Sequence, residues 1–181
     1  MSNNERILGS LRSADGKGVV RLEDRYDTDI DDLWSAITEP SRLARWFGEV
    51  SGDLRAGGRY RLYVEADGVE TIGRIETCEP PRRLVTTSRE TDESYKKGQG
   101  AAPFDEVIEV TLTADGDQTI LVAEIRAVPV VKIEFFGVGW QIHAESLARH
   151  VAGRERGDTE PRWGELLPAY QELAAKLREA S

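Results

Sequence analysis

The spacing of apolar and polar residues changes several times along the chain. Residues 19–26 alternate between the two, as in a strand with one buried face. Apolar residues recur at helical spacing over Asp29–Gly48, at every second position from there to residue 127, and again at helical spacing beyond residue 138. The pattern predicts one strand, two short helices, a run of about six strands, a long helix and a tail helix.

The segment Asp29–Gly48 is predicted to form a helical hairpin with a tight corner. Glu39-Pro40 marks the corner, because proline tolerates the first turn of a helix but not its interior. Thr28 or Asp29 is placed to cap the first helix. The hairpin carries two of the chain's four tryptophans and is too short to bury them itself. We therefore expect it to cover a larger apolar surface.

The alternating segments after the hairpin predict an antiparallel sheet. Strands are expected over residues 49–53, 59–65, 69–78, 83–89, 105–113 and 118–127. Short turns such as Ala66-Asp-Gly68 join them, and strands beside separate helices indicate the α+β class. Residues 90–104 are polar and aperiodic and are interpreted as a mobile surface loop.

The C-terminal part is predicted to be helical. Residues 138–151 form the long helix, which Gly153 ends. Pro168 interrupts the apolar stripe that begins at Trp163, so we expect a turn followed by a terminal helix of about twelve residues. This stripe packs on its own domain or forms a dimer contact, and the protein is expected to be a monomer or a homodimer.

The chain divides into three predicted segments. Residues 1–17 are polar and are interpreted as a flexible arm, and residues 18–153 form the main domain. Residues 154–181 form a charged linker and a tail helix that packs on the domain.

Composition limits the partners. A net charge of −9 argues against binding of nucleic acid or anionic lipid. No apolar run reaches the roughly 18 residues of a membrane helix, and the N-terminus lacks a signal-peptide core. The single cysteine, Cys78, fits a reducing compartment, so we expect a cytoplasmic protein without membrane insertion. No cofactor is expected.

The order of elements and several residues resemble the START-like helix-grip (SRPBCC) superfamily, and within it homologues of the activator of heat-shock protein 90 ATPase. The matching residues are Trp34, Thr38, Pro40 and Trp46 in the hairpin, Glu79-Pro-Pro81 with Leu84, and Gly139-Trp140 at the start of the long helix. The resemblance implies a curved antiparallel sheet that wraps around the long helix, with a cavity roofed by the hairpin.

The resemblance leaves the function open, since the superfamily includes lipid and hormone binders, cyclases, hydroxylase subunits and co-chaperone domains. Co-chaperone activity belongs to two-domain relatives and is not carried over to this chain.

Aromatic side chains are the expected lining of such a cavity. The candidate ligand-binding residues are Trp46, Phe47, Tyr60, Leu62, Phe136, Trp140 and His143. Tyr60 and Tyr63 lie on opposite faces of one strand, and Tyr60 is in step with the apolar residues. Trp34 is interpreted as a core residue, and for each other aromatic residue core packing is the alternative.

No catalytic residue and no metal site is assigned. His143 lies on a mostly apolar helix face, where histidine is more often a hydrogen-bonded core residue than a catalyst. His150, near the helix end, is explained by the helix dipole, and no Cys or Asp completes a ligand set. Arg74 either contacts a ligand anion or lies in solvent on the convex face.

Three hypotheses about function follow. The preferred one is binding of a small hydrophobic or aromatic molecule between the sheet and the long helix. The second is a cyclase- or hydrolase-like enzyme that uses the same cavity, with His143 and an arginine or tyrosine as acid–base groups. The third is a protein-interaction or co-chaperone-like module. Inward polar groups in a well-formed pocket would favour the enzyme over the binding protein. An interior filled by its own side chains would favour the protein-interaction module.

Overall fold

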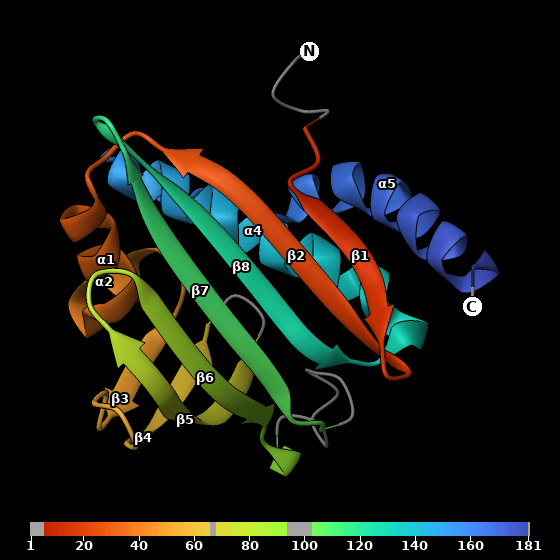
Figure 1. Ribbon diagram of the computed structural model, residues 1–181, viewed down its shortest axis with the longest axis horizontal. Helices are drawn as coiled ribbons and strands as arrows, with labels where there is room; N and C mark the ends of the chain where they lie inside the picture. Colours follow the sequence, from red (N-terminus) through yellow and green to blue (C-terminus); the bar gives the residue numbers. More distant parts are fainter. Residues whose placement is uncertain (1–5, 66–67, 94–102, 181) are drawn as a thin grey trace.

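The alternating segments pair into one curved antiparallel sheet (Figure 1). The computed structural model of the protein describes residues 6–65, 68–93 and 103–180. Within them the sheet has eight strands in the order β1-β2-β8-β7-β6-β5-β4-β3. The strands are β1 (Gly9–Ala14), β2 (Lys17–Tyr26), β3 (Glu49–Gly52), β4 (Arg59–Val64), β5 (Val69–Glu79), β6 (Arg83–Glu90), β7 (Glu106–Asp115) and β8 (Gln118–Val128). The predicted α+β class and antiparallel sheet are confirmed.

The connection after β2 explains the strand order. The chain leaves β2, passes through the helical hairpin to the far edge at β3, and returns strand by strand until β8 pairs with β2. Every neighbouring pair is antiparallel. This route places the hairpin at one end of the curved sheet, where Figure 1 shows it beside β3 and β4.

Two short helices form the hairpin, as predicted: α1 (Ile30–Thr38) and α2 (Pro40–Trp46). Asp29 caps α1, since its Oδ1 accepts a hydrogen bond from the backbone N–H of Asp32 at 2.9 Å. The indole Nε1 of Trp46 donates to the carbonyl of Ala36 at 2.9 Å and so joins the two helices.

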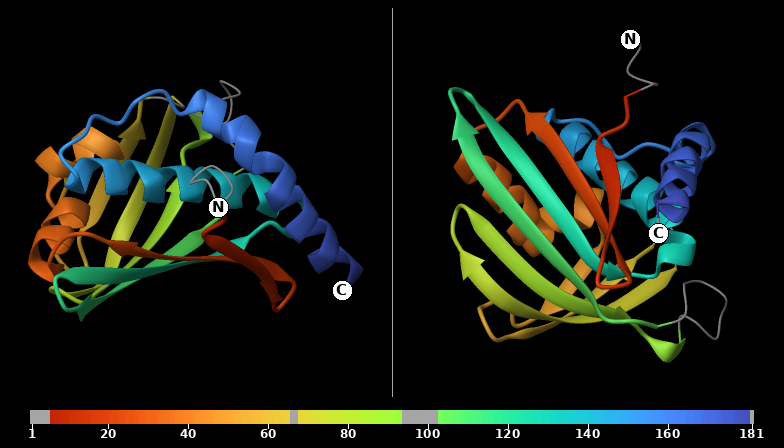
Figure 2. Two further views of the ribbon diagram at one scale, coloured as in Figure 1. Left: turned by 90° about the horizontal axis from the view of Figure 1, so that it is seen from above. Right: turned by 45° about the vertical axis from the view of Figure 1, so that its right-hand side comes forward.

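The long helix α4 (Ile133–Val151) lies across the concave face of the sheet (Figure 2). It follows a 3₁₀ turn, η2 (Val130–Lys132), and begins five residues earlier than the spacing predicts. The extra residues include Gly137 and Gly139. Because glycine disfavours a helix interior, these two residues suggested a helix that begins after them. Gly137 permits a close contact instead, since a Cβ there would lie 2.5 Å from Cδ1 of Tyr170.

The tail forms one helix, α5 (Glu160–Glu179), which contradicts the turn predicted at Pro168. Proline removes one hydrogen bond from a helix interior, but packing on both sides of Pro168 offsets that loss. Leu166, Tyr170 and Ala174 are all fully buried. The hydroxyl of Tyr170 donates to Oε1 of Gln141 in α4 at 2.6 Å, so α5 is held against the long helix.

Part of the predicted N-terminal arm is ordered structure. Gly9–Ala14 form the edge strand β1, in register with β2 from Gly9 opposite Leu22 to Ala14 opposite Lys17. The expectation of a flexible arm is wrong for these residues, because a turn at Asp15-Gly16 folds them back on β2 and both residues adopt positive φ. Residues 1–5 lie outside the described residues.

The apolar core lies between α4 and the half of the sheet formed by β2, β8 and the end of β7. Its fully buried members include Val20, Ile125 and Ile133, and Leu33 of α1 closes one end. None of the described helices is long and apolar enough to cross a membrane. Most of the predicted loop at 90–104 and of the turn at 66–68 falls outside the described residues.

Candidate functional site

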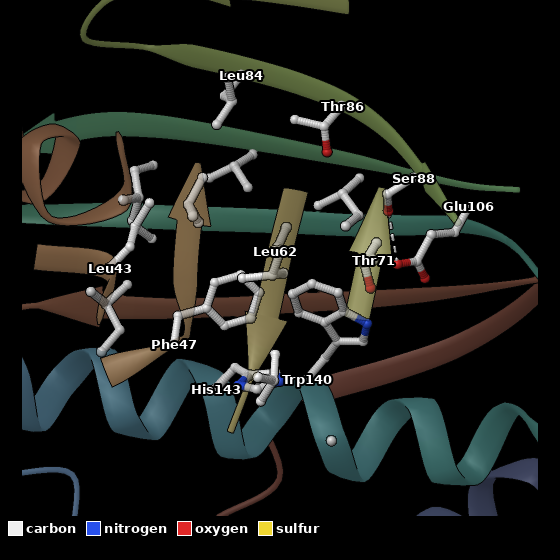
Figure 3. A pocket seen from close by; sticks show the side chains of 18 of the residues that line it. Leu43, Phe47, Leu62, Thr71, Leu84, Thr86, Ser88, Glu106, Trp140 and His143 are labelled. Atoms are coloured by element: carbon white, nitrogen blue, oxygen red, sulfur yellow. Dashed lines mark hydrogen bonds between the residues drawn. The ribbon is translucent and has the colours of Figure 1, made fainter. Parts of the chain in front are cut away.

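A cavity of about 910 Å³ lies between α4 and the other half of the concave face. Inward side chains of β4, β5, β6 and β7 line most of it from the sheet, and residues of β8 and β2 such as Leu121 and Leu22 border it. Trp46 and Phe47 close it at the hairpin end. Figure 3 shows Phe47 and Leu43 at one end of the cavity and Ser88 and Glu106 at the other. The curvature of the sheet thus leaves space beside a helix that elsewhere packs tightly.

All the residues proposed from the sequence line this cavity: Trp46, Phe47, Tyr60, Leu62, Phe136, Trp140 and His143. Tyr60 points inward, whereas Tyr63 is 41% exposed on the convex face. Trp34, interpreted as a core residue, is only partly buried and also lines the cavity.

Four of these residues form a continuous ring cluster. The rings of Trp46 and Phe47 stack at 5.2 Å between centroids. Phe47 lies 4.7 Å from His143 and 6.0 Å from Trp140, with the edge-to-face geometry of a favourable pair at the histidine. The hairpin and α4 therefore present a joined aromatic wall to the cavity.

His143 is a neutral polar group in this wall. Burial, with a smaller contribution from the positive charge of Arg156, lowers its pKa to about 3. Its Nδ1 is buried and has no hydrogen-bond partner among the described residues. A histidine that served only the core would be expected to form a hydrogen bond through this atom, and among the described residues Nδ1 of His143 forms none. Core packing alone therefore does not explain a histidine at this position.

A row of polar side chains crosses the opposite end of the concave face. Register pairs Tyr60 with Gly73, Gly73 with Ser88, and Ser88 with Glu106, so one line runs across four strands. The Tyr60 ring lies over Gly73, where a Cβ would come within 2.4 Å of its Cζ. Ser88 Oγ is 3.2 Å from Oε1 of Glu106 and donates to it (Figure 3).

Glu106 has an unusual protonation equilibrium. Burial raises the pKa of its carboxyl, the hydrogen bond from Ser88 lowers it, and the nearby charge of Glu90 raises it by a smaller amount, so that the pKa is about 7. Burial also raises the pKa of Tyr60, against hydrogen bonds with Thr86 and Ser88 that lower it. At neutral pH the row contains a neutral tyrosine and a carboxyl group that exchanges its proton readily.

Sequence reasoning missed most of the polar residues of the cavity: Thr71, Thr86, Ser88, Glu90 and Glu106. The signal was present in the alternation, because Glu106 is in phase with the apolar residues Ile108 and Val110 of the same strand. Polar residues at inward positions indicate a site, yet the interpretation followed only the apolar ones.

Several other candidates lie away from the cavity. Arg74 lies on the convex face, where its Nε is 3.9 Å from Oε2 of Glu76. Of the two roles suggested for Arg74, this position agrees with a solvent-exposed charge and not with contact to a ligand in the cavity. His150 accepts a hydrogen bond from Nε of Arg42 at 3.1 Å. Among the described residues, no group of three or more His, Cys, Asp and Glu side chains is arranged to hold a metal ion.

Comparison with solved structures supports the fold. CalU16 from Micromonospora echinospora is similar to this chain at 29% identity in its crystal structure, with a TM-score of 0.71 over 92% of this chain and 96% of that chain. Its solution structure gives a TM-score of 0.72 over 99% of both chains at the same identity. DynU16, described as a protein in the dynemicin biosynthetic locus, matches at 24% identity with a TM-score of 0.66, over 77% of this chain and 49% of that chain.

Sequence comparison identifies the family. No curated protein matches the chain. The family model described as Activator of Hsp90 ATPase homolog 1-like protein matches residues 27–152, from just before the hairpin to the end of α4. The helix-grip arrangement of sheet, hairpin and long helix agrees with that match and with the resemblance noted in the sequence. The chain therefore belongs to the Activator of Hsp90 ATPase homolog 1-like family.

Proposed function

We propose that the protein binds a small hydrophobic, aromatic molecule in the cavity between the sheet and α4. The observation that carries the proposal is the unfilled interior of about 910 Å³, at the upper end of the usual range of ligand pockets. Protein interiors are normally packed without large voids, and an apolar void reduces stability. A bound molecule that fills the space would stabilise the folded state.

The aromatic wall suggests where the rings of the ligand lie. Phe47 and Trp140 offer adjacent ring faces, and the sheet opposite them contributes Leu62 and Leu84. A planar ligand between these surfaces would bury apolar area on both sides, and each aromatic contact contributes about 0.5–1.5 kcal/mol beyond burial. Trp46 is 7% exposed and joins the two hairpin helices, so its part in binding is to support Phe47.

A fluorescent neutral probe, N-phenyl-1-naphthylamine, tests this function on the full chain. We expect saturable 1:1 binding by the wild-type protein and an affinity reduced by about 3- to 10-fold in Phe47→Ala and in Trp140→Ala. Tyr63→Ala, on the convex face of β4, is the matched control and should bind as the wild type does. Absence of saturable binding, or an equal loss in Tyr63→Ala, would contradict the proposal.

Acid–base catalysis in the same cavity is a second candidate, favoured by Glu106. His143, the group suggested by the sequence, is a weak base with a pKa of about 3, whereas a carboxyl group with a pKa of about 7 is suited to proton transfer at neutral pH. Glu106 would take a proton from the carbon beside a ligand carbonyl and return one to the enolate.

The exchange of the methyl protons of 2-acetylnaphthalene in D₂O, followed by NMR, tests this chemistry. We expect faster exchange with the wild-type protein than in buffer alone, and no acceleration with Glu106→Gln. Equal exchange with both proteins would exclude Glu106 as the base.

The open cavity does not favour the third hypothesis, a protein-interaction module, which required a filled interior.

A further inference from the structure

The cavity has two chemically different ends. We call the polar strip the inward-facing polar side chains at the end away from the hairpin: Tyr60, Thr71, Thr86, Ser88, Glu90 and Glu106. Its members come from β4, β5, β6 and β7, and register places Thr71 opposite Glu90 beside the row that joins Ser88 to Glu106. Figure 3 shows Thr71, Thr86, Ser88 and Glu106 gathered on one side of Trp140, and Phe47 on the other.

The fold does not require this polar strip. Inward positions of β8 in the same sheet are filled by Leu121, Ala123 and Ile125, and such residues also give a stable concave face. Thr86 and Ser88 are 8% and 4% exposed, so their hydroxyl groups are largely removed from water. Because polar groups are costly to bury, their concentration at one end of a cavity indicates a polar group of the ligand.

The charge of the strip selects the sign of that group. Two carboxyl groups, Glu106 and Glu90, line the cavity close enough for one charge to act on the other. Arg89 is the one Lys or Arg among the described lining residues. Its Nε is 2.9 Å from Oδ1 of Asp105, and both residues also line a hollow on the convex face. An anionic group would be repelled by the ionised carboxylate of Glu106, and a cation would be attracted to it.

Trp140 adds a second attraction for a cation. Its indole ring lies between Phe47 and the polar strip, with its nitrogen toward Thr71 and Glu106 (Figure 3). A cation close to an indole face is stabilised by the quadrupole of the ring, most strongly when water is excluded. A ligand whose rings lie against Phe47 and Trp140 can extend a substituent past the indole toward Glu106.

We propose that the ligand is an aromatic amine whose rings lie against Phe47 and Trp140 and whose ammonium group binds to the polar strip beside Glu106. This inference rests on the proposed function, since it names the substrate class of the same cavity. A neutral hydroxyl group can bond to Ser88, Thr86 or Glu106 but has no positive charge for the Glu106 carboxylate to attract, so the amine binds more tightly.

Three probes with the same ring system test the inference on the full chain: 2-naphthylmethylamine, 2-naphthylmethanol and 2-naphthoate. At pH 8 we expect the wild-type protein to bind the amine about ten-fold more tightly than the alcohol, and the carboxylate most weakly. Glu106→Gln should remove most of the preference for the amine and leave the affinity for the alcohol within about two-fold. Isothermal titration calorimetry measures all three affinities.

Two control variants separate the polar strip from other effects. Glu76→Gln removes the same charge from the convex face of β5 and should keep the full preference for the amine. Phe47→Ala should weaken all three probes alike. Equal affinities for amine and alcohol in the wild type, or tighter binding of naphthoate, would overturn the inference while ring binding stands. Failure of all three probes to bind would overturn the proposed function together with it.

The pH dependence gives an independent readout. Among the described residues, Glu90 and Tyr60 of the sheet interact with Glu106, and His143 is the titratable residue of α4 that lines the same cavity. Tyr60 and His143 are neutral from pH 6 to 8, because burial raises the pKa of the tyrosine and lowers that of the histidine. Affinity for the amine should therefore rise from pH 6 to pH 8 as Glu106 ionises, and affinity for the alcohol should stay constant. A flat profile for the amine would contradict the inference.

Discussion

The two halves of the concave face are built from the same kind of strand but pack differently against α4. In the half formed by β2 and β8, side chains such as Val20 and Ile125 are fully buried and fill the space under the helix. In the half formed by β4, β5 and β6, the sheet curves away from the helix (Figure 2). The inward side chains of this half border a cavity. One half thus stabilises the fold, and the other is free to carry polar groups.

The largest expected effect is the loss of stability when a large side chain is shortened to alanine in each half of the concave face. Ile125→Ala removes a fully buried side chain and should lower the free energy of unfolding by about 2–5 kcal/mol, because a new void forms in a packed region. Leu62→Ala enlarges a cavity that already exists and should cost roughly 1–2 kcal/mol. Urea denaturation measures both, and equal losses would show that the two halves are equally packed.

A second comparison uses hydroxyl groups. Thr119 is fully buried, and its Oγ1 donates to the carbonyl of Thr28 at 2.9 Å. Thr119→Val leaves that carbonyl without its donor and should cost about 1–2 kcal/mol. Thr86→Val removes a hydroxyl group that borders the cavity and one of the two hydroxyl partners of Tyr60, and should cost about 0.5 kcal/mol, because Ser88 remains as a partner. If Thr86→Val costs as much as Thr119→Val, the polar strip is part of the framework.

A third comparison uses the pH dependence of stability. The pKa of His143 is lowered to about 3, so its contribution to stability is lost as pH falls from about 6.5. The pKa of Glu106 is raised to about 7, so its contribution is lost as pH rises from about 4.5 to 7. Between pH 4.5 and 6.5 the two slopes oppose each other in the wild-type protein.

His143→Phe should expose the slope of Glu106. We expect the free energy of unfolding of this variant to increase as pH falls from 7 to 4.5, by at most about 1.4 kcal/mol per pH unit. Glu106→Gln should show the opposite slope below pH 6.5. Thermal denaturation across this range measures both, and parallel profiles for the two variants and the wild type would refute the assigned shifts.

The sequence predicted the parts of the fold that periodicity controls. Alternation located the strands from β2 to β8, and the corner at Pro40 located the hairpin. The errors lie where tertiary contacts override local preference. Gly137 is helical because Tyr170 packs on it, α5 continues through Pro168 because both sides of the proline are buried, and β1 forms because a turn returns it to β2.

The candidate site was predicted in part for a similar reason. Aromatic residues such as Phe47 and Trp140 suggest a lining by their type alone. The role of Ser88 and Glu106 depends on strand register, which brings residues eighteen positions apart into hydrogen-bond contact. The alternation within a single strand does not show which residue of the neighbouring strand lies opposite, so it cannot predict this pair. The cavity itself depends on the curvature of the sheet, which no single residue encodes.

Gly73 has a consequence for the size of molecule that the protein accepts. The ring of Tyr60 occupies the position where a side chain at residue 73 would lie. Any larger residue there would push the tyrosine ring toward α4 and shorten the cavity, although residue 73 would itself remain covered by that ring. Selection among ligands of different length can therefore change by substitution at one glycine, with every residue that touches the ligand kept the same.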